Sequence, residues 1–409
     1  RGAGRGGRRF GQASVGLPDG RVAVVGGFGC GCGPGGAQGR LGDVLLLDPF
    51  GTASGGGALA PGEEPSWREV PCSGAPLRPR VGHAMAALSM REGLAGGVVL
   101  FGGREAPGVP LGDLCLLELS SGGEAEWRDL TGAAAEASPE GCTPSARWRH
   151  SLTNAGLSGR SGGDMLLLLG GWDGAAALGD AFVLQVGCGV SRGSCPVSWS
   201  EVSLEGQVPA ARFGHTVSRL GSAPRPSGAP DQRFVLFGGR DGEKIFGDAF
   251  ALTLVEPAKG DTRWLLRCEE LPSLSPPPPR YAHAACFLPP EGDANGSVLV
   301  VGGCTGAGDG PAAFILNCSS WEWQELQVAG QVAGSRQGDV LWARQGLHGA
   351  PGGGRWPSSG EAECAWVSAR TTTRWCSRAA CRHAHAASRG GAQRRIGLRP
   401  LPNKNYVND

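Results

Sequence analysis

Short runs of apolar residues recur along the chain, and each run ends at a pair of glycines. The runs are too short for an ordinary helix, and they lack the polar alternation of a strand with one solvated face. They therefore predict strands that are covered on both faces. The copies are Val22–Val25 before Gly26-Gly27, Val98–Phe101 before Gly102-Gly103, Met165–Leu169 before Gly170-Gly171, Phe234–Phe237 before Gly238-Gly239, and Val298–Val301 before Gly302-Gly303.

Further marks keep a fixed order around each glycine pair. An arginine with a histidine three residues later lies upstream, a Gly-Asp step lies downstream, and a tryptophan stands near the end of the unit. The Arg/His pairs are Arg80/His83, Arg147/His150, Arg212/His215 and Arg280/His283; the first copy has Gln12 at the histidine position. The Gly-Asp steps are Gly42-Asp43, Gly112-Asp113, Gly179-Asp180 and Gly247-Asp248, and the fifth unit lacks a clean one. The tryptophans are Trp67, Trp127, Trp199, Trp264, and Trp321 or Trp323.

Each unit thus contains four short strand-compatible segments separated by loops rich in Gly, Pro and Ser. A four-stranded sheet cannot bury both faces alone, whereas radially stacked sheets bury them against one another. The sequence therefore predicts an all-β propeller in which the tryptophans fill the gaps between blades. Because they repeat rather than converge on one point, we expect the histidines to be structural, hydrogen-bonded inside their blades. The five clear blades lie near residues 9–67, 80–127, 147–199, 212–264 and 280–323.

The order of these marks resembles the kelch repeat, and the resemblance covers about residues 9–325. Kelch propellers have five to seven blades, which leaves a sixth blade open here. Arg344 and His348 look like another opening motif, but no apolar run with a glycine pair follows them. The units are longer than the usual kelch repeat, and we expect the extra loops to be mobile. Those loops include Gly51–Pro65, Thr131–Pro144 and Gly221–Asp231.

The last part of the chain has a different character, so we place the propeller at residues 1–350 and a tail at 351–409. Residues 361–409 hold nine basic and three acidic side chains and show neither a glycine pair nor a strand pattern. A nucleic-acid-binding tail is one interpretation. We favour a disordered or non-native tail that is not part of the fold. Its cysteines and histidines match no standard zinc spacing, so no metal site is predicted.

Composition narrows the class of protein further. The chain of 409 residues has 73 Gly and 30 Pro, but the glycines lack the strict G-X-Y period of collagen. The 40% of hydrophobic residues is too high for a fully disordered chain. A formal charge of +1 provides no general field for nucleic acid or an anionic membrane. No apolar run is long enough to span a bilayer, so no membrane partner is expected. The 14 cysteines are mostly isolated, which favours free thiols and a cytoplasmic location. The chain begins at Arg1 without a signal peptide pattern, and we interpret it as part of a longer protein.

Four short sequence segments show a more specific resemblance. They are Phe10–Gly29, Trp148–Thr153, Glu205–His215 and Pro279–Ala285, and together they resemble the C-terminal kelch region of the tRNA wybutosine-synthesizing protein 4 (leucine carboxyl methyltransferase 2) family. The resemblance implies a methyltransferase domain upstream in the same chain, which would bind S-adenosylmethionine. The propeller would then position the modified guanosine of phenylalanine tRNA. This segment has no strand-to-helix glycine fingerprint, so we expect no cofactor in it, no catalytic residues and no methylation by it alone.

A non-enzymatic adaptor is the alternative, because many kelch propellers present proteins to ubiquitin ligases or act in trafficking. In either case a binding site is expected on the loops after the glycine pairs, which gather at one end of a propeller. Arg and Trp are common at binding hot spots and can also grip phosphate or stack on a base. Ordinary polar turn residues are the alternative explanation for these side chains. The candidate residues for tRNA or a partner protein are Arg104, Glu105, Trp172, Asp173, Arg240 and Asp241.

Overall fold

The computed structural model describes most of the first 326 residues and three later strands. The described ranges are 9–30, 38–48, 66–89, 94–120, 124–158, 161–187, 196–223, 231–258, 261–272, 274–290, 295–306, 313–326, 340–344, 363–368 and 371–376. The proposed loop Gly51–Pro65 and His348 lie outside these ranges. No helix in the described ranges is long and apolar enough to cross a membrane.

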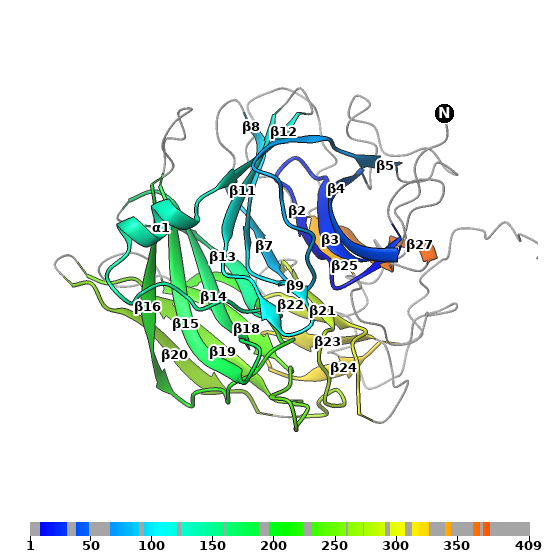
Figure 1. Ribbon diagram of the computed structural model, residues 1–409. Coiled ribbons are helices and arrows are strands. Elements are labelled where there is room, and N and C mark those ends of the chain that lie inside the picture. The colour runs from blue at the N-terminus through cyan, green and yellow to red at the C-terminus, as the bar shows by residue number, and fades with distance from the viewer. Residues whose placement is uncertain are drawn as a thin grey trace, which may run out of the picture.

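The main strands of each blade form an antiparallel sheet in which neighbours along the chain pair with one another (Figure 1). Blade 1 contains β1 (Arg9–Phe10), β2 (Ala13–Gly16), β3 (Val22–Cys30), β4 (Gln38–Asp48) and β5 (Ser66–Glu69). Blade 2 contains β7 (Ala84–Ala87), β8 (Leu94–Phe101), β11 (Leu114–Ser120) and β12 (Ala125–Asp129), with β9 (Arg104–Ala106) and β10 (Val109–Pro110) as a small hairpin. Blade 3 contains β13 (Ser151–Leu157), β14 (Asp164–Trp172), β15 (Ala177–Val186) and β16 (Val197–Gly206).

The remaining blades repeat this plan. Blade 4 contains β17 (Thr216–Ala223), β18 (Asp231–Phe237), β19 (Ala249–Val255) and β20 (Trp264–Glu270). Blade 5 contains β21 (Ala284–Leu288), β22 (Ser297–Val301), β23 (Ala313–Asn317) and β24 (Trp323–Glu325). The apolar runs before the glycine pairs are thus second strands, as predicted. The fold is an all-β, kelch-type propeller.

A sixth sheet closes the ring. Its strands are β25 (Val340–Arg344), β26 (Glu363–Ser368) and β27 (Thr371–Cys376), paired in that order. The first strands of the blades are neighbours in the order β2, β7, β13, β17 and β21, and β25 lies against both β21 and β2. Figure 1 shows β25 beside the blue strands of blade 1.

This sixth sheet changes the picture of the C-terminal part. We expected no strand pattern after residue 361, and that expectation is wrong for β26 and β27. The boundary at residue 350 also falls between two strands that pair, since Val340 of β25 lies opposite Val367 of β26. β25 and β26 lie far apart along the chain, so their pairing is a tertiary contact that a local sequence pattern does not reveal. The other residues of 351–409 lie outside the described ranges.

The hydrophobic core is divided into layers between neighbouring blades. One buried cluster joins blades 2 and 3, and others join blades 1 and 2, 3 and 4, and 4 and 5. The fourth-strand tryptophans of blades 2 to 5 lie in these layers, as predicted, whereas Trp67 packs on residues of blade 1 alone. The Trp199 ring of blade 3 stands 5.3 Å from Phe101 of blade 2, and Trp323 of blade 5 stands 4.8 Å from Phe237 of blade 4. The core therefore stabilises contacts between blades.

Outer strands link the blades a second time. β6 (Cys72–Gly74), which follows blade 1, pairs in parallel with β12 of blade 2, and the end of β16 pairs in parallel with β20 of blade 4. Between blades 2 and 3, helix α1 (Thr131–Ala137) packs against β16 instead, with Ala134 buried in the core. Its residues lie in the loop Thr131–Pro144, which we expected to be mobile. The expectation is wrong there, because an alanine-rich segment formed a helix against an apolar layer.

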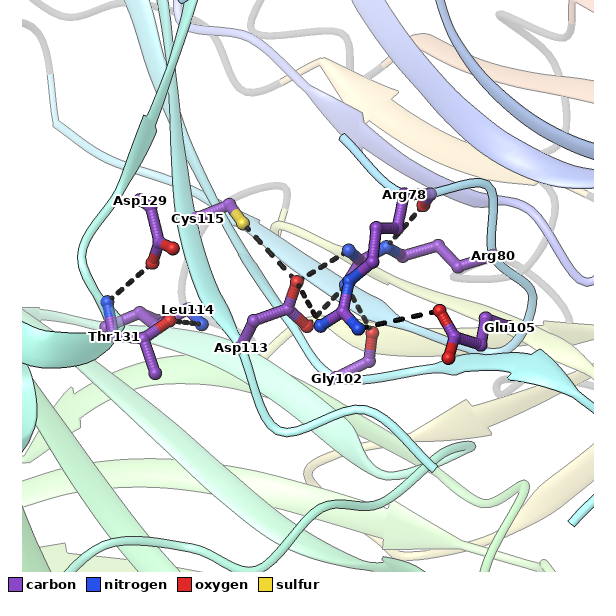
Figure 2. A network of polar contacts seen from close by, with 9 residues as sticks. All are labelled: Arg78, Arg80, Gly102, Glu105, Asp113, Leu114, Cys115, Asp129 and Thr131. Carbon is purple, nitrogen blue, oxygen red and sulfur yellow. Dashed lines mark hydrogen bonds and ion pairs between the residues drawn. The ribbon is translucent and has the colours of Figure 1, made fainter. Parts of the chain in front are cut away.

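A buried arginine connects the repeated marks within each blade (Figure 2). The Arg80 guanidinium donates to both carboxylate oxygens of Asp113 at 2.7 and 2.6 Å, and also to the carbonyl oxygen of Gly102 at 2.9 Å. Its own backbone carbonyl accepts a hydrogen bond from the N–H of Gly27 in the preceding blade. Arg80 thus connects the first, second and third strands of its blade to the blade before it.

The same bidentate pair occurs in four blades. The other pairs are Arg9–Asp43, Arg147–Asp180 and Arg212–Asp248. In blade 5, Arg280 donates to the Gly302 carbonyl at 2.8 Å and lies 4.7 Å from the Phe314 ring. The Gly-Asp steps therefore position the carboxylate for the arginine at the start of the same unit.

The repeated histidines are buried and join neighbouring blades. His215 Nε2 lies 3.1 Å from the Ser151 hydroxyl of blade 3, and His283 Nε2 lies 2.9 Å from the Thr216 hydroxyl of blade 4. Our expectation of hydrogen bonds inside each blade is therefore wrong. His83 and His150 have no hydrogen-bond partner for Nε2 among the described residues. His150 faces blade 2, where Ala84 occupies the position that Ser151 has in blade 3. Alanine has no hydroxyl group to bond to the imidazole.

Burial keeps these imidazoles neutral. Desolvation lowers the pKa of His83, His215 and His283 from 6.5 to about 3, and the arginine three residues upstream acts in the same direction. Desolvation also lowers the pKa of His150. An unfolded histidine takes up a proton near pH 6.5, whereas the folded protein does not. These residues therefore stabilise the fold fully above pH 6.5, and this contribution is lost as the pH falls toward 3.

The first prediction concerns the Arg–Asp pair. Burial alone raises the pKa of Asp113, but the hydrogen bonds and charge of Arg80 outweigh it and hold the pKa below its usual value. Asp113→Asn should lower the free energy of unfolding by about 3 kcal/mol, because it leaves the buried Arg80 charge without its counter-charge. Asp129→Asn is the control, since exposed Asp129 only accepts the Thr131 N–H (Figure 2). Equal urea midpoints for the two variants would contradict the prediction.

The second prediction concerns acid stability. His215→Gln copies the residue that blade 1 has at this position, Gln12, and removes one titrating group. Urea unfolding between pH 7 and 4 should show the wild type losing up to ~1.4 kcal/mol more per pH unit below 6.5 than the variant. Parallel stability curves for the two proteins would show that His215 titrates normally in the fold.

Candidate functional site

In blades 2 to 5, two residues form a short bridge at one end of the propeller. One directly follows the glycine pair, and the other directly follows the buried arginine. The four bridges are Val81 with Arg104, Trp148 with Trp172, Phe213 with Arg240, and Tyr281 with Cys304. The double glycines make these bridges possible, since both glycines of each pair have positive φ.

In blades 2, 3 and 4, the side chain after the glycine pair stacks on the next blade. The Arg104 guanidinium of blade 2 lies 5.2 Å from the Trp148 ring of blade 3. The Trp172 ring of blade 3 contacts Phe213 of blade 4 edge-on at 5.1 Å. The Arg240 guanidinium of blade 4 lies 5.0 Å from the Tyr281 ring of blade 5. The alternation of cations and rings thus continues across four blades.

Arg149 of blade 3 joins this arrangement. Its guanidinium lies 5.8 Å from the Tyr281 ring, two blades away. Burial lowers the pKa of Arg149; the positive charges of Arg104 and Arg240 also lower it, whereas Tyr281 and Cys304 raise it. We call this surface the arginine–aromatic face. Its members are Arg104, Trp148, Arg149, Trp172, Phe213, Arg240, Tyr281 and Cys304.

Most members of the face are neither fully buried nor fully exposed; only Trp148 is buried. Three guanidiniums that are partly removed from water are stronger ligands for an anion than fully solvated ones, because competing water is reduced. The flat rings beside them provide apolar area without much loss of side-chain entropy. The arrangement is suited to binding a segment that combines negative charge with apolar side chains.

The candidate residues from the sequence divide into two groups. Arg104, Trp172 and Arg240 belong to the arginine–aromatic face. Glu105 is exposed beside it, 3.5 Å from Arg78, as Figure 2 shows. This ion pair is solvent-exposed and contributes little to stability.

Asp173 and Asp241 shape the loops that carry the face. The Asp173 carboxylate accepts hydrogen bonds from the N–H groups of Ala175 and Ala176, both at 2.8 Å. The Asp241 carboxylate accepts the equivalent bonds from Glu243 and Lys244. These backbone hydrogen bonds lower the pKa of both carboxyl groups. The geometry supports the turn interpretation for the two aspartates.

Sequence reasoning missed Trp148, Arg149, Phe213 and Tyr281. Each lies between the repeated arginine and the repeated histidine of its unit. The search for repeated residues selected that arginine and histidine and passed over the positions between them. A useful signal was present: these positions vary in type while their neighbours repeat. Variable positions inside a repeated frame are candidates for binding, because the frame does not require them.

Among the described residues, no group of three or more His, Cys, Asp or Glu side chains is placed to hold a metal ion. The buried histidines are spread over four blades, and two of them, His215 and His283, bond to the neighbouring blade. What the face offers is charge and stacking.

Comparison with known proteins agrees with this architecture. The model of the KLHDC2/KLHL20/DRC7 Kelch-repeats domain matches residues 60–256. Adagio protein 3 of Arabidopsis thaliana is 26% identical over 279 residues, which covers 66% of this chain and 38% of that protein. Adagio-like protein 1 of Oryza sativa subsp. japonica is 32% identical over 186 residues, covering 44% and 22%. Serine/threonine-protein phosphatase BSL2 of Arabidopsis thaliana is 25% identical over 261 residues, covering 63% and 21%.

These findings define the class of protein. The matched stretch is a kelch-repeat region, and the fold around it is a kelch-type β-propeller. The chain spans less than half the length of each of these relatives. Kelch propellers generally mediate contacts between proteins.

The third prediction tests the role of the aspartates. Asp173→Ala should speed hydrogen exchange at the Ala175 and Ala176 amides by about tenfold, since a charge-assisted hydrogen bond is lost. The Glu243 and Lys244 amides of the next blade serve as the internal control and should not change. Asp241→Ala should give the reverse result. If neither variant alters its own loop, the carboxylates are not the turn-forming groups.

Proposed function

We propose that this chain is a non-enzymatic protein-interaction propeller that holds a partner protein on its arginine–aromatic face. The observation that carries the proposal is the stacking of Arg104 and Arg240 on rings of the following blades, with Arg149 between them. Stacked, partly desolvated arginines and aromatic rings are the residues that dominate protein interfaces.

The nature of the relatives supports the same proposal. A related stretch occurs in proteins named as a phosphatase and as adagio proteins, and it makes up only part of each. One stretch shared by differently named proteins is expected to provide binding, while other parts of each protein provide its particular activity. An adaptor for ubiquitin ligation or trafficking fits this description.

The tRNA interpretation has less support. The relatives named above include no tRNA-modifying protein, so the wybutosine hypothesis rests on the four sequence phrases alone. The same holds for the S-adenosylmethionine domain that this hypothesis places upstream. The near-zero net charge is a further argument against it, because nucleic-acid affinity depends strongly on the number of phosphates neutralised.

The fourth prediction tests the proposal with a random dodecapeptide library displayed on phage and selected on the purified chain. We expect enriched peptides whose binding, measured by fluorescence anisotropy, weakens about tenfold or more in Arg240→Gln and in Arg104→Gln. Arg263→Gln is the matched control. It also removes a guanidinium, but one that is exposed just before outer strand β20, beside Glu205.

Phenylalanine tRNA is the competing probe. If no peptide is enriched while the tRNA binds with a steep dependence on salt, and Arg240→Gln weakens it, the protein-binding proposal is wrong. Peptide binding that Arg263→Gln weakens as much as Arg240→Gln would place the site elsewhere.

A further inference from the structure

A ring of backbone hydrogen bonds joins five blades just before their first strands. The N–H of Gly82 donates to Gly11 at 2.8 Å, that of Arg149 to Gly82 at 2.6 Å, that of Gly214 to Arg149 at 2.8 Å, and that of Ala282 to Gly214 at 2.7 Å. Each of these residues stands directly before the histidine position of its unit. The ring therefore holds equivalent points of successive blades together.

The ring position requires a left-handed backbone. The φ angles are +67° at Gly11, +68° at Gly82 and +67° at Gly214, which glycine adopts without strain. Arg149 and Ala282 occupy the same position with φ of +54°. A residue with a Cβ is strained there, and such strain persists where the surrounding structure imposes it, often at functional sites.

The Arg149 side chain is not needed for the ring. Gly82 and Gly214 make the same backbone hydrogen bonds without any side chain. The Arg149 side chain packs over Gly82, since a Cβ built on Gly82 would lie 3.4 Å from the Arg149 Cγ, at van der Waals distance. The fold thus accommodates a large cation at a point where three of the five described units have glycine.

Arg149 also lies close to other charged groups of the face. It lies on the side where Arg104 and Arg240 already contribute positive charge, and its guanidinium reaches Tyr281 two blades away. Backbone strain and repulsion from the two nearby guanidiniums act against folding, whereas the contact with the Tyr281 ring acts in its favour. An anionic ligand would reverse the repulsion, since a carboxylate can accept two parallel hydrogen bonds from one guanidinium.

We propose that Arg149 is the specificity-determining residue of the arginine–aromatic face, and that it selects carboxylate side chains in an acidic segment of the partner protein. This inference rests on the proposed function and adds the chemistry of the partner. Charge complementarity supports an acidic segment, and the flanking Trp172, Phe213 and Tyr281 rings would contact its apolar residues.

The test uses a fluorescent peptide, N-acetylated and C-amidated, with three consecutive glutamates between glycine-serine flanks. A counterpart with three glutamines is the matched ligand. The wild type should bind the glutamate peptide about tenfold or more tightly than the glutamine peptide, and Arg149→Gly should remove this preference. Arg149→Lys should keep part of it, because the charge remains. Arg263→Gln should keep all of it.

Thermal unfolding separates this role from a structural one. Arg149→Gly should melt no lower than the wild type, because glycine suits the left-handed position. Arg149→Ala, which copies Ala282, replaces it in the binding test if the glycine variant does not fold. Loss of the glutamate preference together with unchanged or higher melting temperature is the expected pair of results.

Other outcomes overturn the inference. A glutamate preference that survives in both Arg149→Gly and Arg149→Ala would exclude Arg149 as its source. A preference seen only for a glutamine peptide with a free C-terminal carboxylate would exclude acidic side chains as the ligand. Phenylalanine tRNA that binds in an Arg149-dependent way, with no glutamate preference, would assign the cation to phosphate.

Failure of the proposed function itself is distinguishable. If library peptides bind through Arg240 but show no acidic preference, the interaction propeller stands and the assignment of Arg149 falls. If no peptide of either kind binds, both proposals fall.

Discussion

The bidentate contact between the opening arginine and the Gly-Asp carboxylate is the interaction on which the propeller depends. A guanidinium that is fully buried, as in Arg80 and Arg147, is tolerated only with its charge and donors satisfied. The aspartate neutralises the charge, and the carbonyl of the first paired glycine accepts a further hydrogen bond. The backbone of the same arginine reaches the preceding blade. One residue therefore links packing within a blade to packing between blades.

Because one arginine makes these contacts in each unit, the blade structure is retained although the copies of the repeat differ greatly elsewhere. The loops differ in length, α1 replaces the parallel outer strand at one junction, and the fifth unit lacks a clean Gly-Asp step. Each blade still buries its apolar second strand against its neighbours, so variation away from the arginine does not disturb the ring. The buried histidines also stabilise the fold, but only while their imidazoles stay neutral.

The repeated contacts leave a few positions of each unit without a structural role. A residue after the glycine pair and two residues after the arginine face one end of the propeller, where the ring of backbone hydrogen bonds makes no demand on their side chains. Cations and rings fill these positions here and stack from blade to blade. The strained conformation of Arg149 is the clearest case, because glycine serves the ring elsewhere.

The sequence by itself determined the architecture, because the marks of a propeller are local. The apolar run before Gly102-Gly103, the Arg80/His83 pair and the outer-strand Trp127 lie within one unit, and their repetition predicts stacked four-stranded sheets. The sequence also placed Arg104, Trp172 and Arg240 at one end, because the loops after second strands share a side.

Tertiary structure decided what depends on contacts between units. It paired Arg80 with Asp113 and His215 with Ser151, brought Arg149 to Tyr281, and formed a sixth sheet from β25 to β27. It also assigned Asp173 and Asp241 to turns instead of the face. Periodicity describes the surroundings of a residue along the chain, whereas these relations join residues of different strands and blades. They follow only once the blades are stacked around a common axis.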